Sequence, residues 1–246
     1  MGARILPRKY HSLWQQTPPT WAIDMLRFAI TDRTLFGAHE TQRRAGLLAC
    51  TSRWAEAGID FIQLREKDLS PQQLITLCSE IQTLLTSTGS KTRLLLNVPA
   101  ELALTDSILN AHIDGIHLPS TTDPHQISEL RTLFQHRTSV PVEAPQPEFI
   151  SISCHTLAEV DAASANGVDL ILFGPVFGKQ VAGRSIHDGV CLEALQAACT
   201  TAGTTPVLAL GGITHQNTAA CVAAGAAGIA AIRLFAQLPT QPAIQS

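Results

Sequence analysis

The sequence predicts a single α/β domain, a closed (β/α)8 barrel of the TIM type with a parallel eight-stranded core. Three observations lead to this prediction. The 246 residues are 45% hydrophobic and 15% charged, which supplies enough apolar side chains for one large core. From residue 28 onward, a short apolar run, a polar or glycine break and an amphipathic stretch recur eight times. Most of the apolar runs lack polar alternation, which is typical of parallel strands covered on both faces, and eight units favour a closed barrel over an open doubly wound sheet.

The expected strands are the eight apolar runs, at 28–31, 60–64, 93–97, 114–118, 149–153, 169–173, 206–210 and 228–232. Helix start signals lie between them. Ser70 precedes a first-turn proline, and Thr156 is followed three residues later by a glutamate, which predicts a capping box. A further helix is expected over 214–225, with Thr214 as its N-cap.

Residues 1–24 are expected to form a loose N-terminal extension, and the barrel domain is expected to span 25–246. The extension contains basic residues and a proline pair but no uninterrupted apolar core of the kind found in secretory signals. It is interpreted either as a functional tail or as the result of a start codon assigned too far upstream. A transit peptide is a third interpretation.

Charge and composition argue against several classes of partner. Seventeen Lys and Arg against twenty Asp and Glu give a formal net charge of −3 without a basic stripe, so nucleic acid is not an expected partner. No apolar run is long enough to predict a membrane span. The six cysteines are scattered without a C-x-x-C pair, which predicts neither a zinc site nor a disulfide framework and fits a reducing cytoplasm.

Polar side chains crowd the predicted carboxyl ends of the strands, where barrels of this class hold their functional groups. Arg65 and Lys67 follow the second strand and Arg33 follows the first, and this cationic set predicts an anionic ligand. The alternative is that the charged run 65–68 forms surface ion pairs. The residues predicted to bind the substrate or its phosphate are Thr31, Arg33, Gln63, Arg65, Lys67, Asn97, Ser153, Gly174, Lys179, Gly211, Gly212 and Arg233.

The glycine pair Gly211-Gly212, after the seventh strand, predicts a phosphate site, because backbone N–H groups approach an oxyanion closely where no Cβ intervenes. Arg233, after the eighth strand, either adds positive charge to this site or forms a rim salt bridge. The loop 174–187 after the sixth strand contains Lys179, and its composition is typical of a lid or of an ordinary loop.

Two histidines, His117 and His155, fall at strand ends, where an imidazole suits proton transfer near neutral pH. The alternative for each is a structural hydrogen bond to a neighbouring loop. Cys154, beside His155, is expected to be a small buried thiol rather than a nucleophile.

Ordered motifs in the predicted strands resemble the thiamine phosphate synthase and TenI family. They are AITDR at 29–33, GIDFIQLREKD at 58–68, DGIHL at 114–118, SCHTLAE at 153–159, FGPVF at 173–177 and ALGGIT at 209–214. The resemblance covers nearly all of residues 28–235. It implies a barrel that binds thiazole phosphate, with the phosphate held by the loops after the seventh and eighth strands.

The synthases of this family join a pyrimidine diphosphate to thiazole phosphate, with magnesium assisting the departure of diphosphate. Arg65, Lys67 and Asn97 match the synthase residues. Val98, however, stands where the synthases have an aspartate, and Asp123 is a shifted substitute for their second aspartate. If the protein is a synthase, Mg²⁺ is the expected cofactor.

Because it lacks these magnesium ligands, the sequence resembles the TenI branch of the family more closely than the synthases. This resemblance implies a thiazole tautomerase, which shifts a proton on the phosphorylated ring and requires no cofactor. After the sixth strand, the synthases also carry a Thr-x-Thr/Ser-Lys motif. This chain lacks the hydroxyl residues of that motif, and Lys179 is the candidate substitute for its lysine. Pro175 matches the histidine that the TenI branch carries there, so His117 or His155 is expected to move the proton.

Three functions remain open from the sequence. The main prediction is a TenI-like tautomerase, and the alternatives are a thiamine phosphate synthase and a non-catalytic regulatory barrel that binds thiazole phosphate. The expected partners are small phosphorylated molecules, namely thiazole phosphate and, for a synthase, the pyrimidine diphosphate. The oligomeric state is left open, a homo-oligomer included.

Overall fold

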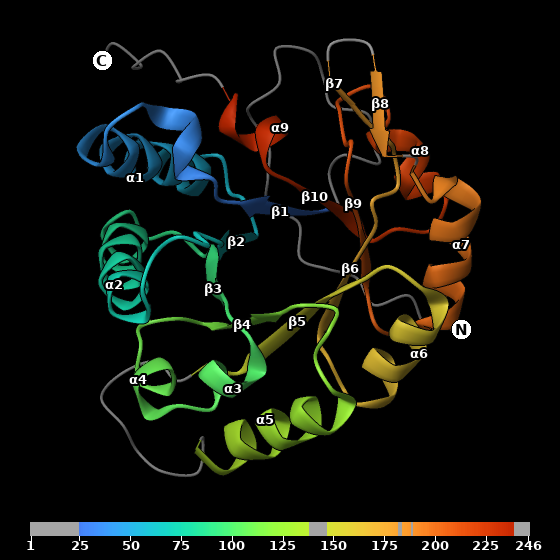
Figure 1. The fold of residues 1–246 in the computed structure, drawn as a ribbon, viewed down its shortest axis with the longest axis horizontal. Coiled ribbons are helices and arrows are strands. Elements are labelled where there is room, and N and C mark those ends of the chain that lie inside the picture. Colours follow the sequence, from blue (N-terminus) through green and yellow to red (C-terminus); the bar gives the residue numbers. More distant parts are fainter. Residues whose placement is uncertain (1–24, 138–146, 182–183, 188, 239–246) are drawn as a thin grey trace.

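The computed structural model describes residues 25–137, 147–181, 184–187 and 189–238 (Figure 1). The extension expected at 1–24 lies outside the described residues. Eight parallel strands close into a barrel in the order β1-β10-β9-β6-β5-β4-β3-β2, which confirms the predicted fold class. The strands are β1 Leu26–Ile30, β2 Phe61–Leu64, β3 Arg93–Asn97, β4 Gly115–Leu118, β5 Phe149–Cys154, β6 Leu170–Phe173, β9 Val207–Leu210 and β10 Gly228–Ala231. The predicted and observed strand ends differ by no more than two residues.

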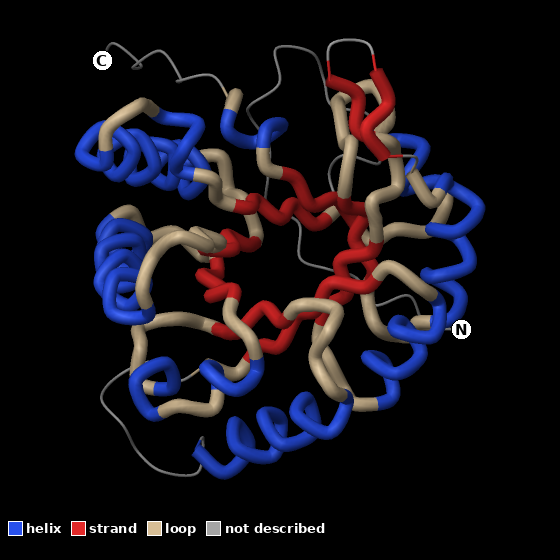
Figure 2. Tube along the Cα trace, in the orientation of Figure 1, coloured by secondary structure: helices blue, strands red, loops and turns tan. Residues whose placement is uncertain are grey.

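Helices surround the ring of strands (Figure 2). They are the 3-10 helix η2 Arg33–Phe36 and the α-helices α1 Glu40–Glu56, α2 Pro71–Ser87, α3 Ala100–Ala103, α4 Asp106–Leu109, α5 Pro124–Arg137, α6 Leu157–Ala165, α7 Cys191–Thr201, α8 Thr218–Ala223 and α9 Arg233–Ala236. Ser70 caps α2 and Thr156 caps α6 through a capping box, as predicted, and Ser70 also forms a capping box with Gln73. None of the helices in the described ranges is long and apolar enough to cross a membrane.

The helix expected over 214–225 is shorter than predicted and begins later. α8 starts at Thr218, and Asn217, not Thr214, is its N-cap residue. The Asn217 side chain instead braces the preceding turn, because its Oδ1 accepts from the Thr214 N–H at 2.8 Å and its Nδ2 donates to the Gly212 carbonyl at 2.9 Å. The sequence pattern therefore located a helix correctly but assigned the wrong capping residue.

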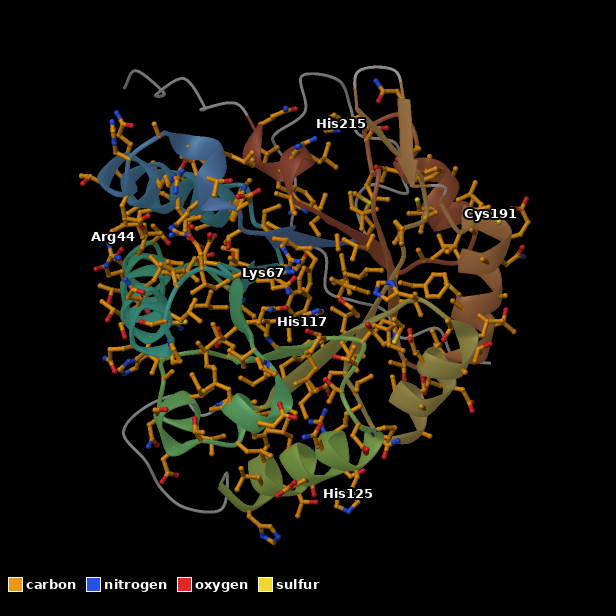
Figure 3. All side chains as sticks on the ribbon, viewed as in Figure 1. Arg44, Lys67, His117, His125, Cys191 and His215 are labelled. Atoms are coloured by element: carbon orange, nitrogen blue, oxygen red, sulfur yellow. The ribbon has the colours of Figure 1, made fainter. Side chains whose placement is uncertain are left out.

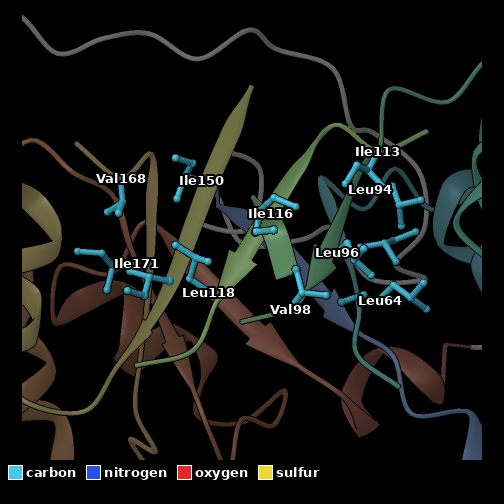
Figure 4. Packing of buried hydrophobic residues seen from close by; sticks show 14 of the residues in the cluster. Leu64, Leu94, Leu96, Val98, Ile113, Ile116, Leu118, Ile150, Val168 and Ile171 are labelled. Atoms are coloured by element: carbon cyan, nitrogen blue, oxygen red, sulfur yellow. The ribbon is translucent and has the colours of Figure 1, made fainter. Parts of the chain in front are cut away.

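The strands alternate between two apolar layers. Side chains such as Phe28, Phe61 and Leu95 fill the interior of the barrel, whereas their strand neighbours pack outward beneath the helices in a larger cluster (Figure 4). Because side chains two residues apart in a strand share a face, Gln63 follows Phe61 on the inner face and Asn97 follows Leu95. The polar layer at the carboxyl end of the barrel is thus a direct result of strand alternation.

Three aspartates tie the amino ends of neighbouring strands together. Asp60, Asp114 and Asp169 each precede an even-numbered strand, β2, β4 or β6. Each accepts a hydrogen bond through Oδ2 from a backbone N–H of the preceding strand, at 2.7–2.8 Å, and donates its own N–H to the carbonyl of that same residue. The partners are Arg27, Leu94 and Ile150. This reciprocal pair recurs at every second strand from β1 to β6.

The loop after β6 contains a hairpin that the sequence analysis did not predict. β7 Lys179–Val181 and β8 Arg184–His187 pair in antiparallel fashion outside the barrel sheet. The start of the loop is held by backbone hydrogen bonds from Val176 to Leu210 and from Phe177 to Gly211, at 2.8 and 3.1 Å. A lid in this region would therefore have to move on a fixed base.

Candidate active site

The inner face of the barrel carries polar side chains at its carboxyl end. Figure 3 labels Lys67 and His117 near the centre of the molecule and Arg44, His125 and Cys191 at its periphery. Gln63, at the end of β2, donates from Nε2 to the Asn97 Oδ1 of β3 at 2.8 Å. The Gln63 Oε1 is buried and has no hydrogen-bond partner in the described residues. The pair therefore offers an unused acceptor on Gln63 and the Asn97 amide N–H groups to a ligand.

His117 is buried between two serine hydroxyls. Its Nδ1 lies 2.8 Å from the Ser151 Oγ and its Nε2 lies 2.9 Å from the Ser153 Oγ. Burial lowers the pKa of His117 to about 3, and the positive charge of Arg65 acts in the same direction. The ring is therefore neutral near pH 7. These contacts favour a role in orienting Ser153 over the proton transfer predicted from the sequence.

Hydrogen-bond direction gives the Ser153 hydroxyl its orientation. The Ser151 hydroxyl donates to the Ile116 carbonyl, a long contact of 3.5 Å, so it accepts from the His117 Nδ1–H. The His117 Nε2 then accepts from Ser153. Ser153, half-buried at the mouth, is left with acceptor lone pairs for a ligand. The sequence analysis missed Ser151, although its position two residues before Ser153 on the same strand face was a usable signal.

His155 differs from His117 because its side chain is exposed at the end of β5. Its Nδ1 contacts the Gly174 carbonyl, which can only accept, so Nδ1 carries a hydrogen, and Nε2 forms no hydrogen bond within the described residues. The His155 backbone N–H donates to Glu159 at 2.5 Å. Of the two predicted histidines, His155 has the geometry of a base. Burial raises the pKa of Cys154 to about 12, which agrees with an inert thiol.

Carboxylates surround the Arg33 guanidinium. Its side chain is buried, and its guanidinium donates to Glu40 at 3.0 Å, to Glu66 at 3.1 Å and to both oxygens of Asp68 at 2.6 and 2.8 Å. Three carboxylates thus occupy all of its nitrogen atoms. Arg33 is therefore not positioned as the phosphate ligand that the sequence predicted.

Arg65 and Lys67 remain as the cations of the second strand end. No ion pair joins either of them to another residue in the described part of the chain. The Arg65 N–H donates to the buried Thr31 Oγ1 at 2.9 Å, so Thr31 fixes the backbone of this segment. Of the charged run 65–68, Glu66 and Asp68 form ion pairs within the described residues, both with Arg33, and the Glu66 pair is buried.

The glycine pair after β9 has the geometry expected of a phosphate cradle. Gly211 and Gly212 have φ values of +92° and +66°. A Cβ on Gly211 would lie 2.5 Å from the Cβ of Pro175, and one on Gly212 would lie 2.7 Å from the Cβ of Phe177. Among the described residues, the Gly212 N–H has no acceptor. This segment therefore keeps a backbone donor available to an oxyanion.

Two further predicted ligands flank this cradle. Arg233 is exposed at the start of α9, directly after β10, and therefore beside the neighbouring strand β9. Gly174 follows β6, and a Cβ there would lie 2.0 Å from the Leu210 carbonyl oxygen, so glycine is required for packing. Lys179 opens β7, and its side chain lies outside the described atoms.

The side chains at the mouth do not fit the magnesium centre expected of a synthase. Val98 is 2% exposed and packs in the outer apolar cluster, as Figure 4 shows. Asn97 Oδ1 already accepts from Gln63. Asp123, the shifted substitute, accepts from the His125 N–H at 2.7 Å at the start of α5, which is a structural contact. Within the described ranges, no three His, Cys, Asp or Glu residues form a group that could hold a metal ion.

The fold and this polar mouth define an enzyme of the (β/α)8-barrel class. The chain belongs to the thiamine monophosphate synthase family, whose model matches residues 29–235. It is 33% identical to a putative thiamine-phosphate synthase of Geobacter sulfurreducens over 85% of this chain and 86% of that protein. It is 30% identical to putative thiamine-phosphate synthase 2 of Aquifex aeolicus over 85% of this chain and 96% of that one. A thiamine phosphate pyrophosphorylase from Pyrococcus furiosus has the same fold, with a TM-score of 0.62, 22% identity and coverage of 87% and 92%.

Proposed function

We propose that the protein is a thiamine phosphate synthase, which joins hydroxymethylpyrimidine diphosphate to thiazole phosphate and releases diphosphate. The sequence-based prediction ranked a tautomerase first. The relatives' names support the synthase alternative better. The observation that carries the proposal is that two groups suited to phosphate, the cations Arg65 and Lys67 and the glycine pair Gly211-Gly212, lie at one barrel mouth.

The two places lie on strands that are not neighbours. Arg65 and Lys67 follow β2, the glycine pair follows β9, and β1 and β10 lie between these strands in the barrel. A tautomerase acting on thiazole phosphate has one phosphate to bind and would leave Arg65 and Lys67 without a ligand. A condensation of two phosphorylated substrates uses both places.

The reaction requires charge stabilisation more than proton transfer. The thiazole nitrogen forms a bond to the methylene carbon of the pyrimidine, the bond from that carbon to oxygen breaks, and diphosphate leaves with the electron pair. Arg65 and Lys67 would stabilise the negative charge on the departing group. The free Gln63 Oε1 and the Asn97 amide N–H groups would orient a polar pyrimidine edge.

The test is formation of thiamine phosphate from the two purified substrates, followed by chromatography in a buffer that contains Mg²⁺. We expect turnover by the wild-type protein and a loss of about a hundredfold in Arg65→Met, because a charge-stabilising contact in the transition state is removed. Arg44→Met is the matched control, because Arg44 pairs with Glu80 between α1 and α2. Binding of both substrates without product would contradict the synthase and support a regulatory barrel.

One observation favours the tautomerase as a second candidate. The His155 ring is held by the Gly174 carbonyl through Nδ1, and within the described residues its Nε2 has no hydrogen-bond partner. The tautomerase would exchange a thiazole proton with solvent, which nuclear magnetic resonance in D₂O detects. Exchange that is lost in His155→Ala would establish this candidate, and absence of exchange in the wild-type protein would eliminate it.

A further inference from the structure

Residues 65–68 alternate in charge, and the structure separates the two signs. The order is Arg65, Glu66, Lys67 and Asp68, directly after β2. Both carboxylates bind the buried Arg33, whereas Arg65 is near enough to the buried His117 ring to lower the pKa of that ring. Arg65 therefore lies toward the barrel interior, Glu66 and Asp68 turn toward Arg33, and Lys67 is exposed.

Arg33 is the residue that holds the anions in place. Its Nη1 donates to Glu66 at 3.1 Å and to Asp68 at 2.6 Å, and its backbone N–H also donates to the Glu66 carboxylate at 3.1 Å. Arg33 and Glu66 side chains are 4% and 3% exposed, so their pair is shielded from water. Asp68 is 60% exposed, but it accepts from two guanidinium nitrogens.

We propose that Arg33 is a positioning residue for diphosphate binding: by holding Glu66 and Asp68, it keeps the neighbouring Arg65 and Lys67 free to face the barrel mouth. This inference rests on the proposed function. Without Arg33, the nearest cations along the chain to Glu66 and Asp68 are Arg65 and Lys67 themselves. They would pair with the released carboxylates and be lost to an incoming anion.

The experiment measures inorganic pyrophosphate binding to the full chain by isothermal titration calorimetry. Arg33→Met is expected to weaken the affinity about tenfold, equal to about 1.4 kcal/mol. Arg44→Met removes the same charge from an exposed ion pair and is expected to change the affinity less than about twofold. Affinity for thiazole phosphate is expected to stay within about twofold in both variants, because its cradle lies after β9.

A rescue variant separates positioning from a general structural role. In Arg33→Met/Glu66→Gln/Asp68→Asn, no carboxylate remains at these positions to capture Arg65 and Lys67, so pyrophosphate affinity is expected to return to within about threefold of the wild type. A folded Arg33→Met with unchanged affinity, or a folded triple variant that remains weak, would overturn the inference. If Arg33→Met does not fold, Glu66→Gln/Asp68→Asn decides: it should bind at least as tightly as the wild type, and a tenfold loss overturns the inference.

The inference and the proposed function fail in different ways. If the wild-type protein itself does not bind pyrophosphate, the proposed function is wrong and the inference falls with it. If the wild type binds pyrophosphate and forms thiamine phosphate while the Arg33 variants follow the overturning pattern, only the inference is wrong.

Discussion

At the scale of single residues, most of the polar side chains described at the barrel mouth orient neighbouring groups, and few of them are free to bind or react with a ligand. His117 is neutral and bonded through both ring nitrogens, and Thr31 uses its hydroxyl on the Arg65 backbone. Gly211 and Gly212 act by lacking a Cβ, because the loop after β6 packs directly against them. Groups at the mouth that keep capacity for a ligand within the described residues include Arg65, Lys67, the Gln63 Oε1 and the Gly212 N–H.

If the glycine pair binds the phosphate, substitutions at Gly212 and Gly203, two glycines of similar backbone conformation, should differ in their effect on thiazole phosphate affinity. Gly212→Ala would place a Cβ 2.7 Å from Phe177, whereas Gly203, with φ +61°, has no atom within 4 Å of an added Cβ. Both alanines meet strain of about 1 kcal/mol from the left-handed conformation. Gly203→Ala therefore measures the effect of this backbone strain without a steric clash. We expect only Gly212→Ala to lose thiazole phosphate affinity, by more than about tenfold. Equal affinity of the two folded variants in calorimetry would contradict the assignment of the phosphate to the glycine pair.

At the scale of elements, the segment after β2 is held by charge and the loop after β6 by backbone hydrogen bonds. Arg33 and its three carboxylate partners link η2, the first turn of α1 and the segment after β2. The contacts of Val176 and Phe177 fix the loop after β6 to the end of β9. The two proposed anion sites are therefore supported by different kinds of interaction, and acid should act directly on the carboxylates of the first.

Acid should loosen the Arg33 cluster. Hydrogen bonds from Arg33, with a smaller effect of Arg43, lower the pKa of Asp68. A carboxyl whose pKa is lower in the folded state stabilises the fold above its unfolded pKa, about 3.9, and that stabilisation is lost as pH falls through the folded pKa. Thermal unfolding from pH 7 to pH 2 should therefore show a smaller acid-induced fall in Tm for Asp68→Asn than for the wild type. Parallel curves would show that Asp68 does not contribute.

At the scale of the whole molecule, opposite ends of the barrel have separate tasks. The carboxyl ends of the strands carry the polar mouth, and the amino ends carry the aspartates that tie strands in pairs. Trp54 of α1 donates to the Phe235 carbonyl of α9 at 2.9 Å, which joins the first and last α-helices of the described chain. Stability and ligand binding can therefore be altered independently.

Removing one aspartate tie should lower stability without affecting the mouth. Asp114→Ala leaves the Leu94 N–H, on a fully buried residue, without its side-chain acceptor, which should cost about 1–3 kcal/mol of unfolding free energy. Asp114→Asn keeps an acceptor oxygen and should cost less, because burial raises the pKa of Asp114 and already disfavours its charge. Asp161→Ala, at an exposed position of α6, is the control for guanidinium unfolding. An Asp114→Ala protein as stable as this control would contradict the assignment.

The sequence alone predicted the strands, the starts of α2 and α6 and the family, because these depend on local periodicity, capping and ordered motifs. Only the tertiary structure showed which charged side chains are bound in ion pairs and which remain available to a ligand. Arg33 and Arg65 look equivalent in the sequence, yet three carboxylates surround the first, one of them at position 40 on another element. Such pairings depend on how separate loops meet in space, and the energies of ionic groups depend on burial, which one-dimensional patterns do not contain.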